Sequence, residues 1–310
     1  MSKSIRLVLG SGGARGLAHI GAIREIESGE SGEISLEARV LLAEDNSVNQ
    51  EVAVAMLEAL GCRVRAVVNG HEVLACIEEE EFDIVFMDCQ MPTMDGFAAT
   101  RAIRQREAGS AESGVGGRRL PIVALTAHAM QSDRQDCLDA GMDDYVAKPF
   151  TKDELGYMVG KWLDGCGEAR PLEGALLKAV AAEEAQQPRS APTFDVRKLE
   201  SLLPSDPAGD GSLARRIVDV YLKSSTELAS ALTDAMAAKD LGKTARIAHT
   251  LKSSSAQVGA AKLSVLSKEL EESAKGGSLD EARELFDDLS AEIEAVHEQM
   301  AALRLGASDE

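Results

Sequence analysis

The chain has 310 residues, of which 45% are hydrophobic and only 3% aromatic, and its formal net charge is −19. This length predicts about two domains, and the apolar share is sufficient for aliphatic cores. The acidic balance disfavours nonspecific binding to nucleic acid or to an anionic membrane, because both need a basic surface.

The cysteines and the apolar runs indicate the cellular compartment of the chain and whether it spans a membrane. The five cysteines form no C-x-x-C pair, which is typical of a protein kept in a reducing cytosol. No apolar run approaches the roughly 18 residues of a membrane span. The first apolar run ends near Gly10, too early for a signal peptide. We therefore expect a cytoplasmic protein with no membrane span and no nucleic-acid partner.

The predicted elements begin with a short fragment and continue as a regular alternation. Residues 1–33 read as a strand, a glycine loop and a short helix that ends in a flexible junction. Residues 38–163 then alternate strand and helix five times, with strands at 39–43, 63–68, 83–88, 121–127 and 144–150 and helices at 47–61, 71–80, 97–107, 132–141 and 151–163. Such alternation with short apolar strands predicts a parallel sheet covered on both faces.

The second half of the chain has a different pattern. Residues 165–193 are rich in Ala, Glu, Gln and Pro and predict a linker. Asp240 is placed to cap one of the helices that follow. Residues 194–305 contain only helical patterns, near 194–203, 212–238, 240–257, 260–275 and 278–303. The simplest packing is an antiparallel four-helix bundle with one accessory helix.

Polar side chains follow the ends of the predicted strands. Glu44 and Asp45 follow the first strand, Asp88 ends the third, Thr126 the fourth and Lys148 the fifth. Ligands of open parallel sheets bind at these carboxyl ends. Three acids packed together repel one another unless a hard cation joins them, and Mg²⁺ prefers carboxylate, carbonyl, water and phosphate oxygens.

These groups together suit phosphoryl chemistry. The Asp88 carboxylate can attack a phosphorus atom and form an acyl phosphate. Mg²⁺ and Lys148 would neutralise the phosphoryl oxygens, and Thr126 could donate a hydrogen bond to one of them. Any one of these residues alone is more often a turn or surface residue. Their combination at predicted strand ends favours the functional interpretation.

Four segments carry a resemblance to a known family. "VLLAEDNSVNQ", "DIVFMDCQMPTMDGFAATRAIR", "PIVALTAHAM" and "GMDDYVAKPF" resemble the receiver domain of bacterial two-component response regulators, especially receivers attached to hybrid sensor kinases. The resemblance covers about residues 38–163, and the combined motifs are highly specific. It implies a doubly wound, five-stranded parallel sheet in the order 2-1-3-4-5.

The resemblance also implies roles for particular residues. Asp88 would be the phospho-acceptor, Asp45 a direct Mg²⁺ ligand, Glu44 a ligand through water, and the Gln90 backbone carbonyl a further ligand. The other implied features are a phosphoryl contact from Lys148, a switch pair formed by Thr126 and Tyr145, and a cis peptide between Lys148 and Pro149.

The segment "ARIAHTLKSSSAQVG", residues 245–259, predicts a helix with a histidine opposite its apolar stripe. We expect this face, with His249, to meet water. Arg246, Lys252 and Ser253 share that face, at the spacing of neighbouring helical turns. No carboxylate lies within one turn on the same helix, so the neighbours of the imidazole favour an anion.

The segment "AHTLKSSSAQVGA" resembles the phosphorylated helix of histidine phosphotransfer (HPt) domains. The resemblance implies an α/β receiver followed by an all-α HPt four-helix bundle at residues 194–305. It implies that His249 exchanges a phosphoryl group with a receiver aspartate while Lys252 and Ser253 hold the phosphoryl oxygens. Ser253 stands where many family members have glycine. The alternative is an ordinary exposed histidine on a bundle helix.

The first residues resemble a different family. "IRLVLGSGGARGLAHIGAIREIE" is similar to the opening of patatin-like lipid hydrolases, in which a glycine loop forms an oxyanion hole. The G-x-S-x-G nucleophile segment of that family does not occur in the sequence. We therefore expect residues 1–33 to be a fragment without hydrolase activity.

These observations predict a phosphorelay intermediate between an upstream sensor histidine kinase and a downstream response-regulator receiver. The linker is too short for an ATP-binding kinase domain, and no helix-turn-helix follows the receiver. Neither kinase activity nor promoter binding is therefore expected. The direction of phosphoryl flow stays open, as does transfer within one chain or between chains. The alternatives are a patatin-type serine hydrolase and a non-catalytic interaction module.

Overall fold

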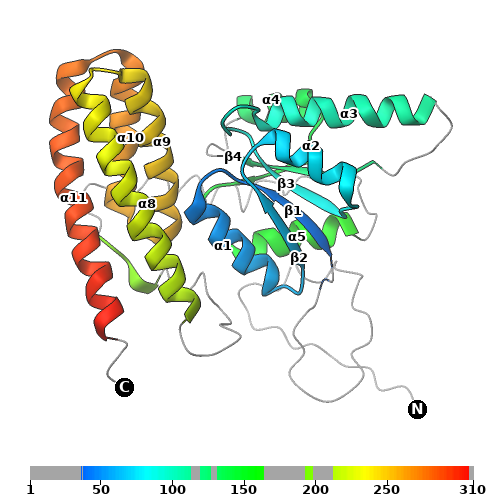
Figure 1. The fold of residues 1–310 in the computed structure, drawn as a ribbon, viewed down its shortest axis with the longest axis horizontal. Helices are drawn as coiled ribbons and strands as arrows, with labels where there is room; N and C mark the ends of the chain where they lie inside the picture. The colour runs from blue at the N-terminus through cyan, green and yellow to red at the C-terminus, as the bar shows by residue number, and fades with distance from the viewer. Residues whose placement is uncertain are drawn as a thin grey trace.

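The computed structural model describes residues 36, 38–112, 119–126, 131–163, 193–197 and 212–306. They form an α/β body beside a bundle of long helices (Figure 1). The predicted fragment 1–33, nearly all of the predicted linker and residues 113–118 lie outside the described residues, so the patatin-like alternative stays a prediction. Within the described part of the chain, no helix is long and apolar enough to cross a membrane.

The α/β body is built on a five-stranded parallel sheet. Its strand order, β2-β1-β3-β4-β5, confirms the predicted doubly wound topology. Every residue of the central strands β3 and β4 is buried, as a sheet covered on both faces requires, whereas the edge strand β2 has exposed residues. The strands are β1 (Arg39–Ala43), β2 (Arg63–Val67), β3 (Ile84–Asp88), β4 (Ile122–Thr126) and β5 (Asp144–Ala147).

Five helices cover the two faces of this sheet. Helices α1 and α5 pack on one face, and α2, α3 and α4 pack on the other (Figure 1). The helices are α1 (Ser47–Glu58), α2 (Gly70–Glu79), α3 (Gly96–Glu112), α4 (Gln131–Ala140) and α5 (Lys152–Leu163). Helix α3 continues to Glu112, so the predicted end at 107 is wrong. Gly109 does not break the helix, because an interior glycine costs only about 1 kcal/mol.

The start of α1 fixes the path of the chain just after the first two acids. The Asn46 side chain caps the helix by accepting hydrogen bonds from the backbone N–H groups of Val48 and Asn49, at 3.0 and 3.3 Å. This cap turns the chain directly from β1 into α1. Glu44 and Asp45 are therefore held at the carboxyl end of the sheet.

The bundle contains four described helices, α8 (Ser212–Ala237), α9 (Leu241–Val258), α10 (Ala261–Gly276) and α11 (Leu279–Gly306). Their bounds lie within three residues of the predicted ones. Asp240 caps α9 as predicted, because its side chain accepts a hydrogen bond from the Lys243 N–H at 2.9 Å. Only 193–197 of the region around the predicted accessory helix are described.

The bundle packs directly against the α/β body. Helices α8 and α9 both contact α1, and Figure 1 shows α1 on the side of the sheet that faces the bundle. The buried apolar side chains of the α1 and α5 layer form one continuous cluster with those of the bundle. This packing places α9, which carries His249, next to the carboxyl end of the sheet.

Candidate functional site

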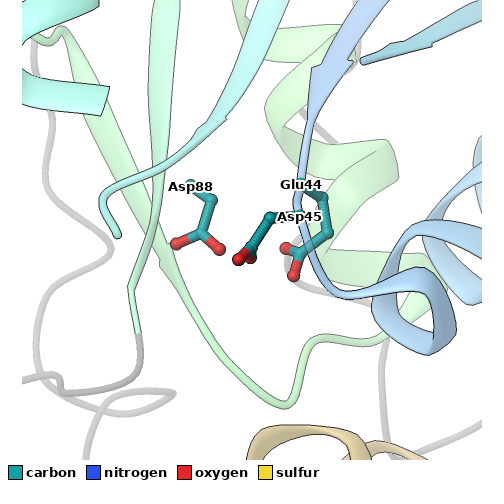
Figure 2. A group of neighbouring side chains, drawn as sticks. All are labelled: Glu44, Asp45 and Asp88. Atoms are coloured by element: carbon teal, nitrogen blue, oxygen red, sulfur yellow. The ribbon is translucent and has the colours of Figure 1, made fainter. Parts of the chain in front are cut away.

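Three carboxylates meet at the carboxyl end of the sheet. Glu44 and Asp45 follow β1, and Asp88 ends the neighbouring strand β3 (Figure 2). One carboxylate oxygen of each lies within 4.8 Å of those of the other two. Glu44 and Asp88 are buried, at 0% and 7% exposure, whereas Asp45 is exposed. This donor set fits a hard divalent cation such as Mg²⁺.

A buried lysine balances part of this charge. Lys148 Nζ lies 2.6 Å from Glu44 Oε2 and 2.7 Å from Asp88 Oδ2. Burial opposes the charge of the lysine, but the carboxylates of Asp88 and Glu44 outweigh it and raise the Lys148 pKa. The ammonium group therefore stays charged. The peptide between Lys148 and Pro149 is cis, as predicted.

Two of the three acids, Glu44 and Asp45, have pKa values above the ordinary range of a carboxyl group. Burial raises the pKa of Glu44 to about 8, with the Asp88 charge adding to the effect and Lys148 opposing it. Burial and the Asp88 charge raise the pKa of Asp45 to about 6. Both shifts arise mainly from burial, and the negative charge of Asp88 adds to them. A bound cation would reduce that repulsion and stabilise the ionised forms.

The loop after β3 packs closely around Asp88. The Gln90 N–H donates to Asp88 Oδ1 at 3.1 Å. Gly96 begins α3 against this loop, and a Cβ added there would lie 2.2 Å from the Asp88 backbone oxygen. Only glycine therefore fits at this position. Gly96 was not identified from the sequence, although the "MDG" segment offered the signal.

One cavity of about 250 Å³ contains both predicted centres. It is lined from the α/β body by the predicted residues Glu44, Asp45, Asp88, Gln90, Thr126 and Lys148, and from α9 by His249, Thr250 and Ser253. The expectation that His249 faces water is wrong, because its side chain is only 22% exposed and lines a cavity shared with the α/β body. Lys252 is not among the lining residues.

A buried carboxylate from α10 holds the histidine. His249 Nδ1 lies 2.9 Å from Glu271 Oε1, and Lys252 Nζ and Lys275 Nζ lie 2.9 and 2.6 Å from the same carboxylate. The prediction that His249 has only basic and hydroxyl side chains as neighbours is therefore incomplete, because it lacks the Glu271 carboxylate. Glu271 was missed because it is 22 residues away in the sequence and on another helix. With Nδ1 donating to Glu271, Nε2 carries the lone pair.

The pKa of Glu271 reflects these partners. Burial acts to raise it, but the hydrogen bonds from His249, Lys275 and Lys252 outweigh burial and lower the pKa below its ordinary value of 4.5. A carboxylate with a lowered pKa in the folded state stabilises the fold at pH values above 4.5. This stabilisation is lost as the pH falls toward the folded-state pKa, because the unfolded chain then binds more protons.

Replacing Glu271 with Gln is therefore expected to destabilise the bundle at pH 7, by about 2 kcal/mol, since three charge-assisted hydrogen bonds weaken. The difference from the wild type should shrink as the pH falls below 4.5. Urea unfolding followed by circular dichroism at several pH values measures it. The neighbouring exposed Glu272→Gln is the control. A Glu271→Gln deficit that does not change with pH would contradict this role.

Two asparagines link the α/β body to α9. Asn49 Nδ2 donates to Ser253 Oγ at 2.8 Å and to Glu44 Oε1 at 3.1 Å, and Asn49 is only 1% exposed. Asn46 Nδ2 donates to the Thr250 carbonyl at 3.1 Å. The Ser253 hydroxyl, predicted to hold phosphoryl oxygens, is thus engaged by the α/β body in this structure. Neither asparagine was identified from the sequence.

Comparison with known families agrees with this division of the chain. Residues 40–159 match the family model of the response regulator receiver domain, and residues 216–299 match that of the Hpt domain. The chain therefore contains a receiver domain followed by an Hpt domain. Together these two domains support a role in a two-component phosphorelay.

Among curated relatives, sensor histidine kinase GacS of Pseudomonas protegens is 48% identical over 124 residues, which cover 40% of this chain and 13% of that protein. Histidine kinase 1 of Arabidopsis thaliana is 40% identical over 152 residues, which cover 38% of this chain and 12% of that protein. The chain thus matches only about an eighth of the length of these relatives.

Two solved structures are among those similar to part of this chain. One is the receiver domain of a Pseudomonas aeruginosa sensor histidine kinase, which is described with magnesium in its active-site cleft. It is 46% identical, and the match covers 41% of this chain and 98% of the matched chain, with a TM-score of 0.37. A co-crystal of a Saccharomyces cerevisiae histidine phosphotransfer protein with a receiver domain matches at 28% identity, covering 43% of this chain and 94% of the matched chain, with a TM-score of 0.40.

Proposed function

We propose that this chain is a phosphorelay intermediate in which Asp88 accepts a phosphoryl group from the phosphohistidine of an upstream sensor kinase and exchanges it with His249 of the same chain. The observation that carries the proposal is the single cavity lined by both residues. The downstream partner is the receiver of another response regulator. We place the relay in the cytoplasm because of the cysteine usage.

The residues around Asp88 suit the first transfer. A carboxylate oxygen of Asp88 attacks phosphorus, the phosphorus–nitrogen bond of the donor breaks, and the donor imidazole leaves. Asp45, Asp88 and the Gln90 carbonyl would hold Mg²⁺ directly and Glu44 through water, and the ion would neutralise charge on the phosphoryl oxygens. Lys148 Nζ, already 2.7 Å from Asp88 Oδ2, is placed to contact one of those oxygens.

The residues around His249 suit the second transfer. Nε2 attacks the phosphorus of the Asp88 acyl phosphate, and the oxygen–phosphorus bond breaks to restore the carboxylate. The imidazole gains positive charge as the new bond forms. The Glu271 carboxylate, 2.9 Å from Nδ1, stabilises that charge and fixes the ring orientation. Thr126, buried at the end of β4, lines the same cavity and can donate to a phosphoryl oxygen.

The proposed cation site predicts a specific loss of Mg²⁺ affinity. Asp45→Asn should weaken Mg²⁺ binding by at least about tenfold, because it removes one of the few charged ligands. Isothermal titration calorimetry of the whole chain measures this. Asp136→Asn is the matched control, since Asp136 lines the same cavity but is not one of the three clustered acids. Equal weakening by both variants would mean that only general charge matters.

The chemistry of the label tests the proposed function. After incubation with a labelled kinase donor and Mg²⁺, the wild type should carry an acid-labile, base-stable label, as a phosphohistidine does. His249→Gln should carry only a base-labile acyl phosphate. A wild type and a His249→Gln variant with the same base-labile label would show that the bundle does not take part in transfer.

A further inference from the structure

Two cysteine side chains that the proposed transfer does not use lie beside Asp88. Cys89 follows Asp88 directly in the chain, and its Sγ is 3.7 Å from the Sγ of Cys137 on α4. The two cysteines are 7% and 2% exposed. Both line the cavity that contains Asp88. A small molecule that reaches Asp88 through this cavity therefore also reaches the two sulfurs.

The separation of the two sulfurs suits the formation of a disulfide. A disulfide bond is about 2.0 Å long, so the sulfurs need to approach each other by about 1.7 Å. Rotation of a cysteine side chain between staggered positions moves its sulfur farther than this. Disulfides in a reducing cytosol are usually transient and serve catalysis or redox sensing. A disulfide at this position would therefore be regulatory rather than structural.

The backbone around Cys89 connects the pair to the walls of the site. The Cys89 N–H donates to the Leu125 carbonyl at 3.2 Å, and the Cys89 carbonyl accepts from the Gly96 N–H at 3.3 Å. Cys89 is thus fixed to β4 and to the start of α3. Cys137 belongs to α4. A covalent bond between the two sulfurs would join α4 to the end of β3 and restrain the loop that carries Gln90.

This restraint would act on the acceptor carboxylate. Both oxygens of the Asp88 carboxylate already have partners, since Oδ1 accepts from the Gln90 N–H at 3.1 Å and Oδ2 from Lys148 Nζ at 2.7 Å. An incoming phosphoryl group must take the place of one partner, and the loop after β3 must adjust to it. A loop that is tied to α4 resists this adjustment.

We propose that Cys89 and Cys137 are an oxidisable thiol pair, which a peroxide converts to a disulfide that slows the phosphorylation of Asp88. The effect on Asp88 rests on the proposed function, whereas formation of the disulfide does not. One sulfur attacks a peroxide oxygen, the oxygen–oxygen bond breaks, and a sulfenic acid and water form. The second sulfur attacks the sulfenic sulfur, the sulfur–oxygen bond breaks, and a second water leaves. Two thiols and one hydrogen peroxide thus give one disulfide and two waters.

The experiment uses the whole chain with His249→Gln, so that a phosphoryl group stays on Asp88. Cys137→Ala removes one sulfur of the pair. Cys76→Ala is the matched control, because Cys76 is 3% exposed on α2 and does not line the cavity. Each protein is left untreated, treated with excess hydrogen peroxide, or treated and then reduced with dithiothreitol.

Two quantities are measured for each protein. Mass spectrometry of its peptides gives the fraction in which Cys89 is joined to Cys137. Incubation with phosphoramidate, a small donor, and Mg²⁺ gives the rate at which Asp88 is phosphorylated. The contact with Cys137 and burial raise the pKa of Cys89, and the thiolate is the form that attacks peroxide, so the treatment lasts hours rather than minutes.

The treated parent and treated Cys76→Ala should contain the joined peptides and phosphorylate Asp88 at least about three times more slowly than their own untreated forms, because small displacements at a reacting centre are costly. Dithiothreitol should restore the rate, since it reduces a disulfide but not methionine sulfoxide. Cys137→Ala should keep the rate of its untreated form.

Three results would overturn the proposal: no joined peptide in the treated parent, a joined pair with an unchanged rate, or equal slowing in Cys137→Ala. Failure of the untreated parent to phosphorylate Asp88 would instead overturn the proposed function. In that case the joined peptides would still report on the disulfide.

Discussion

Asp88→Asn should abolish phosphoryl labelling of the entire chain from a kinase donor, with at least about a 100-fold loss. The amide is a poor nucleophile, so the acyl phosphate does not form. His249 should lose its label together with position 88, because in this account the histidine receives the group only through the aspartate. Autoradiography with separate acid and base treatment of the labelled protein measures both losses.

Asp95→Asn is the matched control for this result. Asp95 lies in the loop after β3, is exposed and caps the start of α3 by accepting from the Ala98 N–H at 2.7 Å. It does not line the cavity. The Asp95 variant should label normally. Persistent labelling of His249 in Asp88→Asn would mean that the kinase donates directly to the bundle.

Lys148→Met is expected to destabilise the receiver domain by about 3 kcal/mol at pH 7, since the change leaves two buried carboxylates without their cation. The pKa of Glu44, already raised to about 8, should rise further. A carboxylate with a raised pKa in the folded state disfavours folding as the pH rises above its ordinary value. The deficit should therefore be larger at pH 8 than at pH 6.

Urea unfolding followed by the fluorescence of Trp162, the single tryptophan and a residue of α5, measures this change. Arg65→Met is the contrasting control. Arg65 pairs with Glu79 and Glu80 on the surface, with side chains 40% to 65% exposed, so its loss should change stability far less than the loss of Lys148. Similar costs for the two variants would contradict the role given to Lys148.

The sequence predicted the sheet and its polar edge well, for a physical reason. Short apolar strands that alternate with amphipathic helices admit few arrangements, and the side chains at strand ends must then gather on one edge. Glu44, Asp88 and Lys148 meet there as expected. The predicted end of α3 is too early, because the first residues of the polar, glycine-rich stretch after Glu107 continue the helix to Glu112.

The contacts around the histidine could not be predicted in the same way. Glu271 reaches His249 from another helix, and only the packing of α9 against α10 brings the two together. Asn49 meets Ser253 across 204 residues of sequence, because the bundle docks on α1. A helical pattern specifies which residues share a face of one helix. It does not specify which helix or domain will cover that face.

The measurement that tests the central claim most directly is complementation between two inactive chains. Asp88→Asn and His249→Gln are mixed with kinase donor and Mg²⁺, and the phosphohistidine label is compared with that of the wild type over a range of chain concentrations. Transfer within one chain predicts that the wild type forms phosphohistidine with a first-order rate that does not depend on the chain concentration. The mixture of the two variants should form phosphohistidine much more slowly, at a rate that rises with the chain concentration. A mixture that matches the wild type at low concentration would contradict transfer within one chain.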